Sequence, residues 1–238
     1  MTNRAEVSPL RIARVAAVCY VGTILLAPLA LFVRGRLVSA DAAATAASIM
    51  SHRSLFFLSF AADLLATACY VAVIGLFYIL LRPVNSTVAL VAACFGLVGC
   101  AIGGFSGIFQ LVPWMLAGAA YLSAFTLEQQ HAMALVFLKL RGQAVNISIV
   151  FFGFYCLLTG YLVLKSNFLP KVLGALMGLA GVGWLTFIIP PLAIALLPFN
   201  QIAGGLGEIS LTLWLLIPGV DVGRWKEQAA KAGLSHGQ

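Results

Sequence analysis

Two carboxylates inside long apolar runs are the side chains in this sequence best suited to chemistry. Asp63 lies in the run Leu55–Leu81, and Glu208 lies in the run Ile202–Pro218. An ionisable side chain inside a membrane-spanning run is costly, so it usually has a partner or a function. At about 1.5 Å per helical residue, we expect Asp63 about 12 Å and Glu208 about 9 Å inside the outer boundary of the bilayer.

Helical spacing places further polar side chains on the same faces. Thr67 and Tyr70 follow Asp63 by four and seven residues, and Thr212 follows Glu208 by four residues. Residues at these spacings share one helical face. Two amides, one in the third span and one in the fourth, are expected at a similar depth, although hydrogen bonding between helices would also explain them. We therefore predict an outward-facing polar pocket among spans two, three, four and six, with these candidate ligand-binding residues: Asp63, Glu208, Asn146, Gln110, Thr67, Tyr70 and Thr212.

Catalytic and metal-binding motifs are absent from the sequence. It contains no GxSxG, Walker A or HExxH pattern. His52 and His131 are expected on the same side as the two carboxylates, but their spacing matches no metal-binding pattern. The five cysteines are odd in number and show no CxxC spacing. We predict no catalytic residues, no metal and no cofactor.

The composition is that of a multi-pass membrane protein. Hydrophobic residues make up 62% of the chain and charged residues 9%, whereas about a quarter of a soluble chain is charged. The net charge of +7 comes from Lys and Arg at the ends of apolar runs, without the basic and aromatic patch of a nucleic-acid site. We expect the lipid bilayer, and not nucleic acid, as the surrounding partner.

The apolar runs predict an all-α, polytopic membrane protein with six transmembrane helices and short external helices. The expected domains are a cytoplasmic N-terminal segment (1–14), a six-helix transmembrane domain (15–220) and a cytoplasmic C-terminal tail (221–238). Asp41 is expected to cap a short helix after the first span. A capping box at Thr126 and Gln129 predicts a separate surface helix over 126–142, followed by the fourth span over 144–164.

The distribution of basic residues predicts the orientation. With the N-terminus in the cytoplasm, nine Lys and Arg residues lie inside and five lie outside, and cytoplasmic loops are the ones enriched in these residues. We therefore predict that both termini are cytoplasmic.

Four short motifs resemble a known family. They are Leu80–Asn85, Phe151–Gly153 with Gly160–Leu162, Ser166–Gly174 and Leu213–Leu216. In this order they are similar to a bacterial membrane family catalogued as domain of unknown function 4386. The resemblance covers the chain from the first span to Gly219. It implies a six-span protein of the bacterial inner membrane and implies no activity.

Three hypotheses about function remain open. The leading one is a protein that binds or carries a small amphipathic molecule or lipid in the polar pocket. The second is a structural or assembly subunit, in which Gly-rich faces dock a partner helix or a second copy of the chain. The third is an intramembrane enzyme that uses Asp63 and Glu208 as an acid/base pair, although a non-enzyme is favoured.

Overall fold

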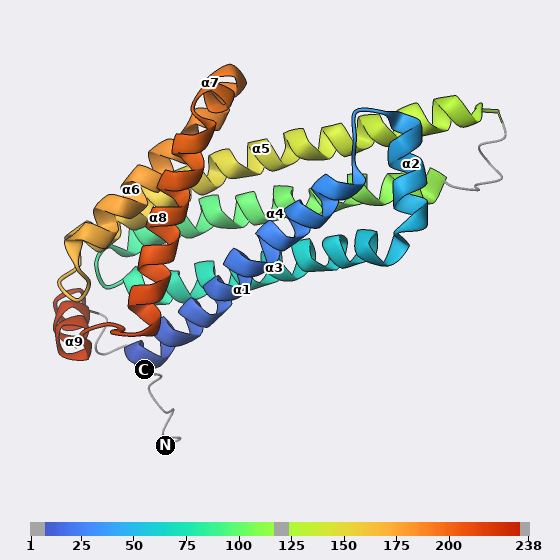
Figure 1. Ribbon diagram of the computed structural model, residues 1–238. Coiled ribbons are helices and arrows are strands. Elements are labelled where there is room, and N and C mark those ends of the chain that lie inside the picture. The colour runs from blue at the N-terminus through green and yellow to red at the C-terminus, as the bar shows by residue number, and fades with distance from the viewer. Residues whose placement is uncertain (1–7, 117–123, 234–238) are drawn as a thin grey trace.

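The computed structural model of the protein describes residues 8–116 and 124–233, and the predicted all-α fold is confirmed for these residues. Helices follow one another with short connections (Figure 1). Their bounds are α1 (Pro9–Leu37), α2 (Ala42–Ser51), α3 (Arg53–Leu81), α4 (Ser86–Leu116), α5 (Leu127–Lys165), α6 (Lys171–Leu185), the 3-10 turn η2 (Thr186–Ile188), α7 (Pro190–Ala195), α8 (Leu197–Leu216) and α9 (Val222–Lys231).

Five helical segments are long and apolar enough to cross a membrane. They are α1, α3, α4, α5 and the segment Lys171–Ile188, which joins α6 to η2. The predicted sixth span, α8, has 20 residues but is not among these five. Five such helices indicate a multi-pass membrane protein. The count of six spans stays a prediction.

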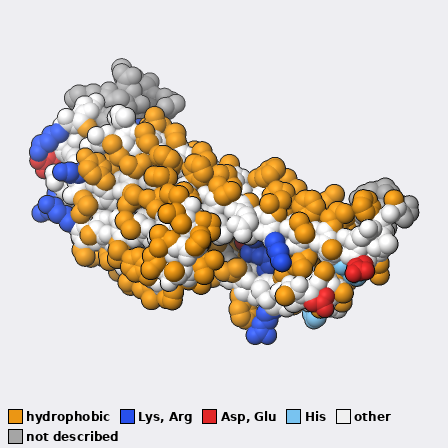
Figure 2. Space-filling model, turned by 90° about the horizontal axis from the view of Figure 1, so that it is seen from above, with side chains coloured by type: hydrophobic (Ala, Val, Ile, Leu, Met, Phe, Trp, Pro, Cys, Tyr) orange, Lys and Arg blue, Asp and Glu red, His pale blue; other side chains and the backbone are white. Residues whose placement is uncertain are grey.

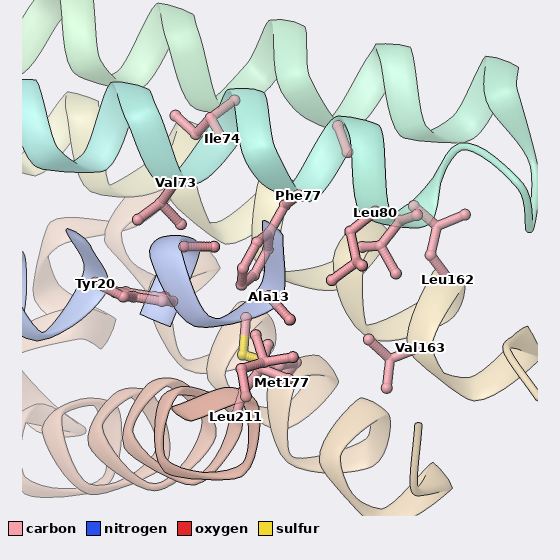
Figure 3. Close-up of a cluster of buried hydrophobic side chains, with 14 of the residues drawn as sticks. Ala13, Tyr20, Val73, Ile74, Phe77, Leu80, Leu162, Val163, Met177 and Leu211 are labelled. Carbon is pink, nitrogen blue, oxygen red and sulfur yellow. The ribbon is translucent and has the colours of Figure 1, made fainter. Parts of the chain in front are cut away.

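The long helices pack as a closed ring. In order around the bundle, α1 contacts α3, α3 contacts α4, α4 contacts α5, α5 contacts α6, α6 contacts α8, and α8 contacts α1. Side chains from all six of these helices form one buried core, which includes Tyr20, Phe77, Met177 and Leu211 (Figure 3). The interior is therefore filled by apolar and aromatic packing. We refer below to the two ends of the bundle as the α2 end and the α9 end (Figure 1).

The outer surface of the bundle is apolar. Leu31, Phe105 and Ile194 have 64%, 61% and 75% of their surface exposed. Figure 2 shows hydrophobic side chains over most of one face, with charged side chains gathered mainly at its two ends. Since soluble monomers rarely expose continuous apolar patches larger than a few hundred Å², this surface is suited to contact with lipid.

Helix α5 corrects one prediction. The capping box is confirmed, because Thr126 accepts a hydrogen bond from the Gln129 backbone and the Gln129 side chain accepts one from the Thr126 backbone. The separate surface helix over 126–142 is wrong, because α5 continues without a break for 39 residues. Gly142 has no positive φ and so does not end the helix. A single interior glycine costs a helix only about 1 kcal/mol, which the packing of α5 on α4 and α6 outweighs.

The two ends of the bundle carry short helices. Asp41 caps α2 as predicted, accepting hydrogen bonds from the backbones of Ala43 and Ala44. At the other end, Trp225 of α9 donates its indole N–H to the Leu80 carbonyl at 2.8 Å. Helix α1 begins at Pro9, inside the predicted N-terminal segment, and α9 lies inside the predicted C-terminal tail. Residues 1–7 and 234–238 of these two segments lie outside the described residues.

Glycines allow α5 and α6 to pack backbone against backbone. A Cβ placed on Gly160 would lie 2.7 Å from the Gly174 carbonyl oxygen and 2.8 Å from the Gly178 nitrogen. A Cβ on Gly181 would lie 2.8 Å from the Gly153 carbonyl oxygen. Because the atoms in the way are backbone atoms, no side-chain movement can make room for a larger residue.

Replacing Gly160 by Val is expected to destabilise the bundle by about 1–3 kcal/mol, since the added carbons must push α6 away from α5. The matched control is Gly142→Ala in the same helix, where a Cβ would have nothing within 4 Å. That variant should gain about 0.5–1 kcal/mol, because alanine loses less backbone entropy than glycine. Thermal unfolding in detergent, followed by tryptophan fluorescence, measures both. A destabilised Gly142→Ala would contradict the continuous helix α5.

Candidate ligand site at the α2 end

Asp63 is the centre of an ionic cluster made by three helices. It lies on α3, and its Oδ2 accepts a hydrogen bond from Nη1 of Arg34 on α1 at 2.6 Å. The same oxygen accepts a short hydrogen bond from Nη2 of Arg141 on α5. The side chains are 14%, 23% and 6% exposed for Arg34, Asp63 and Arg141. We call these three residues the ionic cluster.

A fourth helix joins the cluster through an amide. Gln110 of α4 is fully buried, and its Oε1 accepts a hydrogen bond from Arg34 Nη1 at 3.3 Å. Its Nε2 donates to Ser59 Oγ on α3 at 2.9 Å, and Ser59 donates in turn to the Phe56 carbonyl at 2.8 Å. Buried polar groups are stable when such a chain of hydrogen bonds satisfies them.

The cluster lies about one bilayer thickness along α3 and α5 from the α9 ends of these helices. On α3, 18 residues separate Asp63 from Leu81, and on α5, 24 residues separate Arg141 from Lys165. At about 1.5 Å per residue these stretches measure about 27 and 36 Å, and the hydrocarbon core of a bilayer is about 30 Å thick. If the α9 ends of these helices mark one boundary, the cluster lies at the other.

An apolar cavity of about 220 Å³ lies beyond the cluster, under α2. Its lining includes Ala46, Ile49, Pro113 and Ala134. Ile49 is also buried in the layer next to the cluster, against the partners Leu37, Phe56 and Leu138. On α4 the cavity begins one helical turn after Gln110. Drug-sized ligands occupy pockets of about 300–1,000 Å³, so this cavity has room for a small apolar group or part of a chain.

Glu208 belongs to a separate polar group. Its Oε1 accepts a hydrogen bond from the indole N–H of Trp184 on α6 at 3.0 Å. The face of Trp184 covers Gly204, where an added Cβ would lie 2.1 Å from the ring. The main packing partners of helix α8 are α6 and α1. The two carboxylates that the sequence proposed for one pocket therefore have different partners.

The remaining candidate residues have mainly local contacts. Thr67 and Thr212 each donate to the carbonyl four residues earlier, those of Asp63 and Glu208, at 2.9 and 2.7 Å. Tyr70 is 6% exposed and packs edge-on against Tyr20 and Phe152 in the core. Asn146 is partly exposed on α5, five residues after Arg141. The structure thus brings together Asp63 and Gln110, with Thr67 one helical turn from Asp63. The other four candidate residues are not in the ionic cluster, and the Tyr70 hydroxyl lies 3.4 Å from that of Tyr20.

Sequence reasoning missed Arg34 and Arg141. It assigned both to the group of basic residues that mark topology. The sequence did hold a signal for the pairing with Arg34. A carboxylate in an apolar run usually has a charged partner, and α1 carries a basic residue three positions before its end. The pairing itself joins residues that are 29 and 78 positions apart in sequence.

Asp63→Asn is expected to destabilise the protein by about 2–4 kcal/mol. Removing one partner of a buried ion pair costs about 3–5 kcal/mol, and Asp63 is 23% exposed, which reduces the loss. The control is Glu227→Gln, which removes an ion pair to Lys231 whose side chains are 65% and 69% exposed; it should leave the unfolding temperature unchanged. Equal unfolding temperatures for Asp63→Asn and wild type would show that the ionic cluster does not hold the α2 end together.

Trp184→Phe removes the indole N–H that donates a hydrogen bond to the Glu208 side chain. We expect a loss of about 1–3 kcal/mol, the usual cost of a polar group left without its partner. Adding Glu208→Met should recover part of this loss, because an apolar pair has no unmet hydrogen bond. Trp214→Phe, at an exposed indole on α8, is the control. Additive losses in the double variant would argue against the hydrogen bond as the cause.

Comparison with known proteins agrees with the sequence resemblance. The sequence profile of the domain of unknown function 4386 matches residues 15–219. An uncharacterised protein of Archaeoglobus fulgidus is 29% identical over 148 residues, which are 60% of this chain and 72% of the archaeal protein. No solved structure matches the chain. The profile covers most of the chain, so the protein belongs to the family of domain of unknown function 4386.

Proposed function

We propose that the protein binds a small amphipathic molecule or lipid at the α2 end of the bundle. The polar part of the ligand contacts the ionic cluster, and the apolar part occupies the cavity under α2. The observation that carries this proposal is the position of a charged group of side chains near an apolar cavity at one end of the bundle. We infer from the helix lengths that this end lies where lipid headgroups meet hydrocarbon.

Several contacts support a connection between the cluster and the cavity. Arg141, Leu138 and Ala134 follow one another on a single face of α5, at spacings of three and four residues. Leu138 packs in the buried layer between the two sites, and Ala134 lines the cavity. A ligand with one polar and one apolar end fits this sequence of surfaces.

The assembly hypothesis has less support. It requires an exposed Gly face on α4 or α6. A Cβ on Gly99, Gly103 or Gly107 would meet the side chains of Phe152, Ser148 and Phe60 at 3.0, 3.2 and 3.2 Å. On α6, Gly174 lies against the backbone of α5. The α4 face is filled by the chain itself, and the α6 face is filled at Gly174, whereas a Cβ on Gly178 would have nothing within 4 Å. Most of the glycines that a partner helix or second copy would use are therefore already covered.

The enzyme hypothesis also has less support. An acid/base pair needs two groups within reach of one reacting atom, directly or through one water. Asp63 is held by two arginines from α1 and α5, whereas Glu208 is held by an indole N–H from α6. A binding role agrees better with this separation.

We further propose that the protein lies in a bacterial inner membrane with six spans and both termini in the cytoplasm. Basic residues at the α9 end support this orientation, and they include Arg11, Arg14, Arg82, Lys165 and Lys171. In this orientation the α2 end faces away from the cytoplasm.

Filling the cavity tests the proposal. Ala46→Leu places three additional carbons in the cavity, and Ala47→Leu, at an exposed position of the same helix, is the matched control. Native mass spectrometry of the detergent-purified proteins measures bound molecules directly. We expect a discrete bound mass on wild type and on Ala47→Leu that is reduced severalfold on Ala46→Leu, because the apolar part of the ligand loses its space.

Two results would contradict the proposal. The first is the absence of a bound mass on any of the three proteins after mild purification from membranes. The second is equal retention by all three, which would place the bound molecule elsewhere on the apolar surface.

A further inference from the structure

We propose that the ionic cluster is an anion site, and that the polar part of the ligand is a phosphate or carboxylate group held by Arg34 and Arg141. This inference rests on the proposed function and names the chemistry of the ligand's polar end. In this arrangement Asp63 is a counter-ion inside the protein, which holds the two guanidinium groups in place when no ligand is bound.

The first argument is a surplus of hydrogen-bond donors. Two guanidinium groups carry ten N–H donors, and within the described residues those of Arg34 and Arg141 make three hydrogen bonds. Both arginines use the same oxygen of Asp63. Arg141 Nε is buried without a partner among the described residues, although buried donors are usually satisfied. A ligand group with several acceptor oxygens would accept hydrogen bonds from the N–H groups of Arg34 and Arg141 that Asp63 does not bind.

The second argument is charge. The cluster holds two positive charges and one negative charge. Around it, the α2 end adds Arg36, Arg53 and Lys139, against Asp41 and Glu128. Asp41 is occupied as the cap of α2. A net positive charge next to hydrocarbon is costly and is relieved by an anion.

The third argument is geometry and access. A guanidinium group binds phosphate and carboxylate through two parallel hydrogen bonds, which an ammonium group cannot do. Arg34 and Asp63 are partly open, at 14% and 23% exposure. Figure 2 shows Lys and Arg side chains set within the apolar surface toward the α2 end. The distance of the cluster from the α9 end, about one hydrocarbon thickness, is compatible with contact to the headgroups of one leaflet.

The test compares two lipids that differ only in the anionic group. Delipidated protein in detergent is titrated with phosphatidic acid or with diacylglycerol of the same acyl chains, and binding is read by native mass spectrometry. The variants are Arg34→Lys and Arg141→Lys, which keep the charge that pairs with Asp63 but lose the forked donors. Arg36→Lys is the control, because Arg36 is exposed and lies over the Phe32 ring.

We expect wild type and Arg36→Lys to bind phosphatidic acid at least about tenfold more tightly than diacylglycerol, the factor that one charge-assisted hydrogen bond contributes. Arg34→Lys and Arg141→Lys should lose most of this preference. Competition with inorganic phosphate then separates two sources of the anion. Displacement of phosphatidic acid by millimolar phosphate indicates a site for soluble phosphate compounds, and its absence indicates a lipid headgroup.

A second measurement does not depend on the arginine variants. Asp63→Asn removes the internal counter-ion, and phosphatidic acid should raise its unfolding temperature more than it raises that of wild type. Diacylglycerol should raise both equally. A purely structural cluster would show no such difference between the two lipids.

The outcomes separate this inference from the proposed function. Equal binding of the two lipids by wild type, unchanged in the Lys variants, overturns the anion site while an amphipathic ligand remains supported. Binding of neither lipid, together with no bound mass after purification, overturns both. A preference for phosphatidic acid that Arg36→Lys also loses overturns the assignment to this cluster, since it would reflect the overall charge of the α2 end.

Discussion

A single carboxylate oxygen holds the α2 end of the bundle together. Asp63 Oδ2 joins α3 to α1 through Arg34 and to α5 through Arg141, and Gln110 extends the hydrogen bonds to α4. These four helices are consecutive in the ring. Bringing three charges to the edge of hydrocarbon carries a large desolvation cost, which only good geometry and further hydrogen bonds offset. The amide of Gln110 is one of those further bonds.

The two carboxylates inside apolar helices are accommodated by different physical means. Asp63 lies toward one end of the bundle and pairs with two guanidinium groups, whose long side chains can keep the charged group near a polar surface. Glu208 lies on α8 and accepts a hydrogen bond from a neutral indole, which adds no further charge to the interior. Trp184 can approach α8 because position 204 is a glycine. The hydrogen bond from the indole to Glu208 therefore depends on the absence of a side chain at this position. This difference is why only Asp63 is assigned to the ligand site.

The sequence was sufficient for the class of fold and for most helix positions. Length and hydropathy placed the long helices, and cap residues such as Asp41 and Thr126 placed their starts, because these signals act within a few residues. The continuity of α5 could not be predicted from Gly142. Glycine occurs both just after the end of a helix and inside helices that are held by packing on their neighbours. Asp63 and Gln110 were predicted from their types alone. Their partners depended on how α1 and α5 cross α3, which no local pattern records.

The filled interior of the ring argues for binding at one end and against passage along the axis. Tyr20, Tyr70 and Tyr155 are 0%, 6% and 1% exposed and contact one another through their rings. The space beside Ile74 and Tyr155 amounts to about 10 Å³, which is at the lower limit for one water molecule. Moving a solute past these rings would require the core to repack, whereas Arg34 and Asp63 at the α2 end are already partly exposed. A bound anion would also stabilise the folded protein in proportion to its concentration, because the guanidinium groups that bind it are the same ones that connect α1 and α5 to α3.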